Sequence, residues 1–420
     1  MSETGERPLW TTDFRRLWWG EAVSFFGSQL TLFAIPIVAL THLHASAAEV
    51  AWLTAASGVG TLLFLGAFGP WTDRGRRTRF MSSLSLLRSA ALGVVVVLLL
   101  TDHLSMLVLA VAIAVISGLT GLYESAFSAL VPTIVDRSRL TSANSWVAGI
   151  RSAGDIGAGA AAGALLQLLS PVVLFLADAI SYLVSALSVA GVRDHPARAI
   201  PRQTFGEYTR SLGNGMRTLR RSPIMWPTTL AIAHFNLFTS AIQAVYLVHA
   251  LRSGSMSPVE VGIAGTIGGC IGLASTALAP LVWRRYRPAL VLTATFCFPA
   301  ASAIGIAALD RAGGLLNVAL LGVSLGSWAS CVMINIAGTE TLKQLTIPET
   351  EIGNVSAASR ILTWGIDPVG AALAGVLALL FPTAFILVVG AAGVVASCVW
   401  VLASPHLRAL RMLTEAVPLA

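Results

Sequence analysis

Long apolar runs separated by short polar turns dominate this 420-residue sequence. A membrane-spanning helix needs about 20 consecutive apolar residues, because every backbone amide inside the bilayer has to be paired within the helix. Only 11% of the residues are charged, against about 25% in soluble domains. The sequence therefore predicts an all-α membrane protein. We count twelve spans, at about 17–41, 50–72, 79–101, 105–131, 144–169, 171–191, 224–250, 259–282, 288–309, 314–338, 355–380 and 382–403.

The arginines are unevenly distributed between the loops that alternate along the chain. With the N-terminus inside, the outer loops contain only Arg252 and Arg311, and every other loop base lies inside. Basic loops stay cytoplasmic, because arginine crosses a bilayer at a high free-energy cost. We expect a multi-pass protein of the cell (plasma) membrane with both termini cytoplasmic. The net charge of +7 follows from these loops and does not indicate a nucleic-acid partner.

One inner loop, GPWTDRGRRTRF at 69–80, combines four arginines with a single acid. The acid, Asp73, lies where a helix leaves the lipid, so it can pair with an arginine or with the N-terminus of a neighbouring helix. Such a contact can break and re-form when two helical blocks rock. The alternative is a loop that only sets topology and happens to contain one acid.

The longest loop, at about 192–223, separates two halves of six predicted spans each. We predict an N-terminal bundle at 1–191, a cytoplasmic linker at 192–223 and a C-terminal bundle at 224–420. In the linker, apolar residues at three- and four-residue steps predict an amphipathic helix at the membrane surface. These residues are Phe205, Tyr208, Leu212, Met216 and Leu219.

The fifth and eleventh predicted spans have similar sequences. Asn144 matches Asn354, and Asp155 falls near Asp367. The basic loop repeats weakly as APLVWRRYRP, with Trp283 in place of the acid. Two such repeats are typical of secondary transporters that work by alternating access.

Several stretches carry a family resemblance. Gly69, Asp73, Arg74 and Arg77 resemble the loop motif between helices two and three of the major facilitator superfamily. The stretches DFRRLWWGEAVSFFGSQLT, LRSA, YESAFSALVP and LADAISYLVSAL are similar to its twelve-helix bacterial drug:proton antiporter branch, which includes macrolide efflux proteins and siderophore exporters. The resemblance implies two pseudo-symmetric six-helix bundles, with those four loop residues in gating. Members of the branch usually have Gly-Pro in the fifth helix, where this chain has Gly157-Ala158.

Acids inside the spans are the candidates for proton coupling, since a mid-span charge costs about 2.5–3.5 kcal/mol. The leading pair is Asp155 and Asp367, at matching places in the two repeats. Arg151 and Arg360 lie on the same helix faces, so they are the expected charge partners. A change in burial or in arginine distance would then alter the affinity of the acid for a proton. A static ion pair is the alternative for Arg151 and Asp155.

Glu21 and Glu124 are the other coupling candidates. Glu21 lies about one turn inside the first span, where it could equally be an interfacial acid reaching toward Arg15 and Arg16. Arg88 is expected to pair with Glu124 or with the loop around Asp73. The candidates for lining a substrate cavity are Asp178, Tyr182, His234, Phe25, Phe33, Trp328 and Trp364, although the apolar aromatics suit lipid contact equally well.

These features favour a proton-coupled secondary active exporter of amphiphilic small molecules such as drugs, macrolides or secondary metabolites. No Gly-rich phosphate loop is present, so an ion gradient is the expected energy source, with sodium as the alternative ion. We expect no enzymatic activity, no cofactor, no metal, no disulfide and a monomer. The alternatives are an uptake symporter on the same fold and a non-transporting membrane sensor.

The loop acid gives a first prediction. Asp73→Asn is expected to abolish or strongly reduce transport and leave membrane insertion intact, because asparagine keeps the shape of the side chain but removes its charge. Transport into vesicles, normalised to the amount of membrane-inserted protein, measures this. Wild-type export by a normally inserted variant would reduce the loop to a topology signal.

Overall fold

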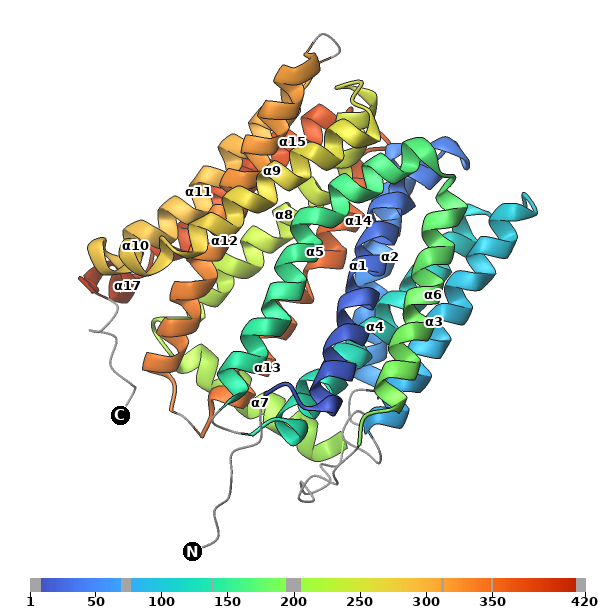
Figure 1. The fold of residues 1–420 in the computed structure, drawn as a ribbon. Coiled ribbons are helices and arrows are strands. Elements are labelled where there is room, and N and C mark those ends of the chain that lie inside the picture. Colours follow the sequence, from blue (N-terminus) through green and yellow to red (C-terminus); the bar gives the residue numbers. More distant parts are fainter. Residues whose placement is uncertain are drawn as a thin grey trace, which may run out of the picture. The chain divides into compact units, whose positions relative to one another are not determined.

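A computed structural model describes residues 9–68, 77–136, 139–193, 205–310, 313–348 and 350–412, in which the regular elements are all helices (Figure 1). Gly69, Asp73 and Arg74 of the basic loop lie outside the described residues. The chain divides into two compact units, and α2 (Ala47–Phe68) contributes to both, since Ala45–Ala55 groups with the second. The other helices of the first unit are α1 (Thr12–Thr41), α3 (Arg77–Leu100), α4 (Met106–Ile134), α5 (Leu140–Leu168) and α6 (Pro171–Ala190).

The second unit contains the remaining helices. They are α7 (Phe205–Arg221), α8 (Met225–Arg252), α9 (Pro258–Thr276), α10 (Ala279–Arg285), α11 (Pro288–Ala307), α12 (Gly314–Thr346), α13 (Ile352–Trp364), α14 (Asp367–Leu377), α15 (Thr383–Ala396), α16 (Cys398–Leu402) and α17 (Pro405–Ala409).

Eleven helical segments in the described part of the chain are long and apolar enough to cross a membrane. The one predicted span that is not among these eleven, the fifth, corresponds to α5, which has 29 residues. At 1.5 Å per residue it is about 44 Å long, more than the roughly 30 Å of a hydrocarbon core. Arg151, Asp155 and many glycines interrupt its apolar sequence. The all-α membrane fold predicted from the sequence is confirmed.

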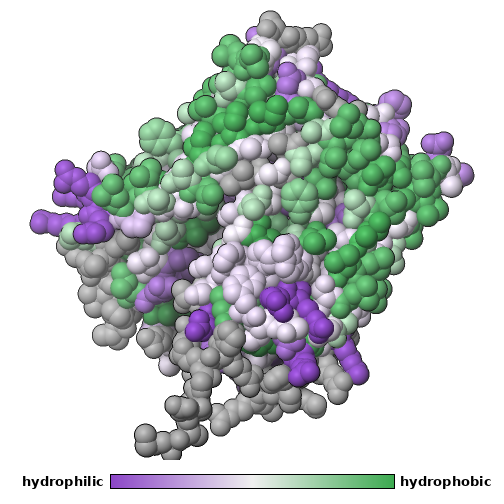
Figure 2. Space-filling view, viewed as in Figure 1, coloured by the Kyte–Doolittle hydropathy of each residue, from purple (hydrophilic) through white to green (hydrophobic). Residues whose placement is uncertain are grey.

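The surface agrees with a lipid environment. Figure 2 shows hydrophobic residues over much of the visible face, with the strongly hydrophilic residues near helix ends. Large apolar side chains such as Leu107, Leu187 and Leu315 are 74–87% exposed. Apolar patches of this extent are rare on soluble monomers and are expected where lipid covers the protein.

Small residues bring the helices of the first unit together. α1 and α3 both pack along α6 (Figure 1). A Cβ atom at Gly27 of α1 would lie 2.7 Å from Asp178 Oδ1, so only glycine fits there. Ser82 and Ser89 of α3 donate hydrogen bonds to backbone carbonyls of α6, at 3.0 and 2.7 Å. Close approach through small and hydroxyl side chains is the usual packing mode inside a bilayer.

Three predicted spans of the second unit are interrupted. The eighth span breaks between α9 and α10, the eleventh between α13 and α14, and the twelfth between α15 and α16. Pro280 and Pro368 lie in the first turn of α10 and α14, where a missing N–H does no harm. The breaks therefore follow from local sequence at the first two places.

The predicted linker helix is present as α7, and it packs along α13. Ser211 donates to Asn354 Oδ1, and Thr218 donates to Glu351 Oε2, each at 2.6 Å. Gly215 lies so close to the backbone of Asn354 that a side chain there would overlap it. The helix is thus held by hydrogen bonds as well as by its apolar face.

The four cysteines are free thiols. Two of them nevertheless meet, with Cys297 Sγ of α11 lying 3.1 Å from Cys398 Sγ of α16. The two residues are 101 positions apart in the chain. Spacing along the sequence gave no indication of this contact.

Candidate functional site

Three charged side chains from three helices meet in the first unit. Nη2 of Arg151 on α5 lies 3.4 Å from Glu124 Oε1 on α4 and 3.9 Å from Glu21 Oε1 on α1. The Glu21 side chain is only 6% exposed, whereas those of Glu124 and Arg151 are 47% and 38% exposed. One arginine is therefore shared between a buried carboxylate and a half-exposed one.

These contacts add partners that the sequence did not predict. Arg151 was predicted to pair with Asp155 one turn along the same helix, and its described partners come from α1 and α4. The side chain of Asp155 lies outside what the structure describes. Glu124, one of the partners expected for Arg88, is engaged by Arg151 instead.

Arg88 occupies the interior of the same unit. Arg88 is only 2% exposed. Its Cζ atom lies 4.3 Å from the centroid of the Tyr123 ring and 4.4 Å from the centroid of the Tyr182 ring. Nη2 donates to Ser85 Oγ at 2.9 Å. An arginine between two aromatic faces is stabilised by cation–π attraction, which strengthens where water is excluded. No described ion pair joins Arg88 to Glu124, because the rings of Tyr123 and Tyr182 hold the guanidinium. The other partner expected for Arg88, the loop around Asp73, lies outside the described residues.

Hydroxyl groups connect this arginine to its surroundings. Tyr123 Oη lies 3.2 Å from Ser185 Oγ, which lies 3.4 Å from Ser85 Oγ. On the other side, Ser28 donates to Tyr182 Oη at 2.9 Å. Buried polar groups inside a membrane protein have to satisfy one another, so the four helices that supply these residues are locked in one register.

Asp178 is fully buried in α6, as the sequence predicted for a span acid that avoids lipid. Oδ1 accepts a hydrogen bond from Ser181 at 2.9 Å. Oδ2 has no hydrogen-bond partner, and the buried hydroxyl oxygen of Thr31 has none either. Sequence reasoning found Asp178 and Tyr182 but missed Thr31, because a threonine in an apolar helix gives no signal of its own.

The candidate coupling acid of the second unit, Asp367, has a different environment. Asp367 is the first residue of α14, and no described residue pairs with its partly exposed carboxylate. Arg360 lies over the Trp364 ring instead, with Cζ 5.7 Å from its centroid. The helix is interrupted at Gly365 and Ile366, so the seven-residue spacing no longer places Arg360 and Asp367 on one continuous face. The expected Arg360–Asp367 pair is therefore not formed.

The remaining candidates lie at separate places. Arg77, the described residue of the loop motif, is buried and donates to the carbonyl of Ala129 at 3.1 Å. His234 accepts from Trp400 Nε1 at 3.3 Å. Phe25 lies beside Arg151, at 5.9 Å between ring centroid and Cζ, and Trp328 lies 6.1 Å from the ring of Phe235. Phe33 is half-buried and Trp364 is 62% exposed.

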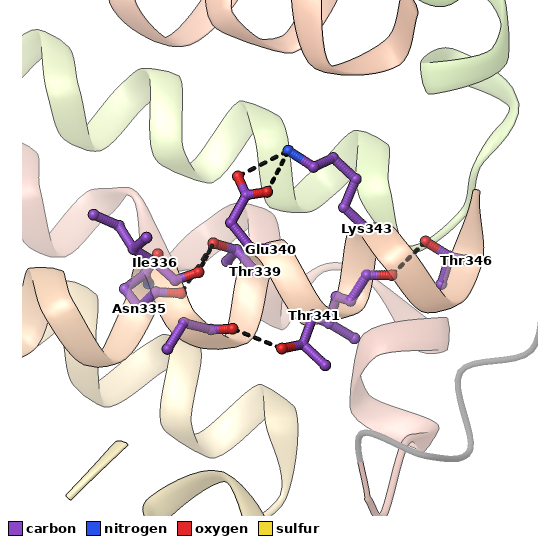
Figure 3. A network of polar contacts seen from close by, with 9 residues as sticks. Asn335, Ile336, Thr339, Glu340, Thr341, Lys343 and Thr346 are labelled. Carbon is purple, nitrogen blue, oxygen red and sulfur yellow. Dashed lines mark hydrogen bonds and ion pairs between the residues drawn. The ribbon is translucent and has the colours of Figure 1, made fainter. Parts of the chain in front are cut away.

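A second polar network lies near the end of α12 (Figure 3). Lys343, the only lysine of the chain, is 8% exposed and lies 2.7 Å from Glu340. Earlier in the same helix, Asn335 donates to Thr295 of α11 at 2.9 Å. The i,i+3 spacing of Glu340 and Lys343 could have revealed the ion pair from sequence.

The sequence profile of the Major Facilitator Superfamily matches residues 17–366. The chain belongs to the major facilitator superfamily. Its members are transporters, so this protein is a secondary transporter and not an enzyme. No curated protein sequence matches the chain.

Solved structures of several transporters have a similar fold. A bacterial homologue of the iron transporter ferroportin, in an inward-facing state, has a TM-score of 0.71 and 19% identity, covering 93% of this chain and 98% of its own. The nucleoside transporter NupG has a TM-score of 0.69 and 12% identity, covering 94% and 99%. A bacterial homologue of the human lysosomal transporter Spinster has a TM-score of 0.66 and 14% identity, covering 98% of both chains. At these identities the likeness concerns the fold alone, and no branch of the superfamily is singled out.

Proposed function

We propose that this facilitator is a proton-coupled exporter of amphiphilic small molecules that works by alternating access. The predicted bundles at 1–191 and 224–420 would rock about a central site, with the 192–223 linker between them. The observation that carries proton coupling is the cluster of Glu21, Glu124 and Arg151, drawn from three helices of the first unit.

An arginine shared by two carboxylates is suited to coupling. Protonation of one carboxylate removes its attraction for Arg151 and leaves the arginine to the other. Glu124 is half exposed and can exchange protons with water, whereas Glu21 is buried. Charged groups at such depth are retained mainly where they serve transport or hold helices together. The coupling role first assigned to Asp155 and Asp367 is retained for both acids, although Asp367 lacks the expected contact with Arg360.

The substrate class rests on sequence resemblance. The stretches at the first, third, fourth and sixth spans are similar to the drug:proton antiporter branch. The structural neighbours are described as iron, nucleoside and lysosomal transporters, so the fold alone does not choose among substrates. Phe25 beside Arg151 provides an aromatic surface next to charge, which suits amphiphiles.

The test is growth inhibition by a panel of amphiphilic compounds in a strain without its own efflux pumps. Cells that produce the wild-type protein are expected to tolerate several compounds, and Glu21→Gln is expected to abolish that tolerance. Glu340→Gln is the matched control, since Glu340 is also ion-paired but lies in the second unit. Exported compounds should then move in inverted vesicles when a pH gradient is imposed, with sodium replaced by choline.

Other outcomes would change the proposal. Increased sensitivity together with accumulation in cells would indicate an uptake symporter. Transport that requires sodium and ignores the pH gradient would overturn proton coupling. If no compound of the panel moves in either direction, the proposal of an amphiphile exporter fails. The alternative of a non-transporting membrane sensor is then favoured.

The proposed orientation gives a further prediction. In a variant without the four native cysteines, a cysteine at Glu207 of α7 should be labelled by an impermeant maleimide only after the cells are opened, because the arginine-rich 192–223 segment is cytoplasmic. A cysteine at Asp102, between α3 and α4, is the control and should be labelled in intact cells. Labelling of position 207 in intact cells would show that the orientation is the opposite of the one proposed.

A further inference from the structure

Two thiol groups of the second unit meet beside the break in the twelfth predicted span. Sγ of Cys297, near the middle of the apolar helix α11, lies 3.1 Å from Sγ of Cys398, the first residue of α16. Cys398 is buried, and Cys297 is partly exposed. A covalent S–S bond is about 2.05 Å long, so these are separate thiols whose sulfur atoms need to approach by about 1 Å to bond.

The helix break that precedes Cys398 lies at Ser397. The hydroxyl of Ser397 donates to the carbonyl of Val394 at 2.6 Å, and the Ser397 side chain is fully buried. A serine hydroxyl that bonds to a carbonyl of the preceding turn competes with the backbone hydrogen bonds of the helix and often bends it. After this break α16 packs against α11, and the contact brings the thiol of Cys398 to that of Cys297.

No strong interaction holds the Cys398 thiol away from Cys297. Its other described contact is with the carbonyl of Thr293, at 3.5 Å, and a thiol is a weak hydrogen-bond donor. The other two cysteines are Cys270 of α9 and Cys331 of α12, for which the structure describes no contact with a second sulfur atom. The four cysteines are therefore one pair and two separate thiols.

We propose that Cys297 and Cys398 are a modification site, at which a peroxide converts the two thiols into a disulfide that ties α11 to α16. The sulfur of Cys297, the more accessible of the two, attacks one oxygen of hydrogen peroxide and the O–O bond breaks. The departing hydroxide takes the thiol proton and leaves as water, so Cys297 becomes a sulfenic acid.

The second thiol completes the reaction. The sulfur of Cys398 attacks Sγ of Cys297, the S–O bond breaks, and the S–S bond forms. The hydroxide leaves with the thiol proton of Cys398 as a second water. The two thiols together lose two electrons, and the peroxide gains both, so no further oxidant is needed.

The position of the pair inside two apolar spans suits this chemistry. Hydrogen peroxide is small and uncharged, so it enters the bilayer, whereas the charged thiol glutathione is excluded by the cost of moving charge into lipid. The disulfide would join residues 101 positions apart, and in the chain-entropy model long loops give the largest stabilisation. The site depends on neither the substrate nor the direction of transport, so it stands apart from the proposed function.

The test compares two full-length variants that keep two thiols each. Cys270→Ser with Cys331→Ser keeps the pair, and Cys297→Ser with Cys398→Ser is the matched control, which keeps the two separate thiols. Both proteins are purified, placed in lipid vesicles and treated with hydrogen peroxide. The pair variant should lose both thiols, and mass spectrometry without reductant should find the peptides of Cys297 and Cys398 linked within one chain. The control should give no linked peptides within one chain.

Thermal unfolding gives the second measurement. The midpoint of the pair variant should rise after oxidation and return when dithiothreitol restores the thiols, whereas the midpoint of the control should not rise. A pair variant that keeps its thiols, or that links only between chains, would overturn the proposal. A disulfide that forms without raising the midpoint would contradict the tie between α11 and α16. If a double variant does not fold, Cys297→Ser alone should still remove the linked peptides that oxidised wild type gives, and their persistence would overturn the assignment.

Discussion

Valine in place of Gly60 is expected to prevent the first unit from folding. A Cβ atom at Gly60 of α2 would overlap the carbonyl of Ala114 on α4, and the obstacle is backbone rather than a flexible side chain. Ser57 and Ser117 lie 2.8 Å apart on the same two helices, so separating the helices would also break that hydrogen bond. We expect a destabilisation of about 3 kcal/mol or more, at the upper end for overpacking. The amount of monodisperse protein extracted from membranes and its thermal midpoint measure the effect.

Two glycines of the same unit serve as controls. A Cβ atom added at Gly66 of α2 or at Gly93 of α3 would have no neighbouring atom within 4 Å. Gly66→Val and Gly93→Val should therefore be extracted in wild-type amounts with unchanged thermal midpoints. A Gly60→Val protein that behaves like these two would contradict the α2–α4 contact.

In the second unit, too, a glycine allows the backbones of two helices to approach closely. A side chain at Gly370 of α14 would overlap the backbone carbonyl of Leu237 on α8. Three glycines of α5 differ from these. A Cβ atom at Gly149 or Gly157 would have no neighbouring atom within 4 Å, and the nearest atoms to one at Gly154 belong to the side chains of Phe25 and Gln29. Glycine content alone therefore does not reveal which helix makes the close contact.

Most of the fold could be predicted from the sequence because a bilayer imposes one dominant constraint. Each apolar run is helical in the structure, including α5, although three runs of the second unit are divided into two helices. The linker helix was predictable because its apolar residues recur at helical spacing, as Leu212, Met216 and Leu219 do. The positions of the helix breaks were harder to predict from the sequence, because a proline does not always mark one. Pro36 and Pro132 lie inside continuous helices, whereas Pro368 follows an interruption.

The candidate site was predicted as residues but not as contacts. Glu21, Glu124, Arg88 and Arg151 could be selected because a charge in a span is unusual. Their pairing depends on helix rotation and register across α1, α3, α4 and α5, about which spacing along one helix says nothing. Same-helix reasoning accordingly paired Arg151 with Asp155 and Arg360 with Asp367, where the described contacts are with Glu21, Glu124 and Trp364.

Removing the shared arginine is expected to have the largest effect within the charged cluster. Arg151→Met leaves the buried carboxylate of Glu21 without its nearest cation, and Glu124 without its partner. Removing one partner of a fully buried pair costs about 3–5 kcal/mol. Because the Arg151 side chain is 38% exposed, we expect a smaller loss of stability, of about 1–3 kcal/mol. Proton-driven transport should be lost altogether. The thermal midpoint in detergent and vesicle transport are the two measurements.

The double variant separates charge from structure. Arg151→Met combined with Glu21→Gln removes the unpaired buried charge, so stability should return while coupled transport stays absent. Lys343→Met is the control, because its ion pair with the half-exposed Glu340 spans one turn of a single helix, and such pairs contribute about 0.5 kcal/mol or less. Transport should survive in that control. If Arg151→Met alone is as stable as the wild type, or if the double variant is less stable than the single, Arg151 does not hold Glu21. The proposed coupling would then lose the contact on which it rests.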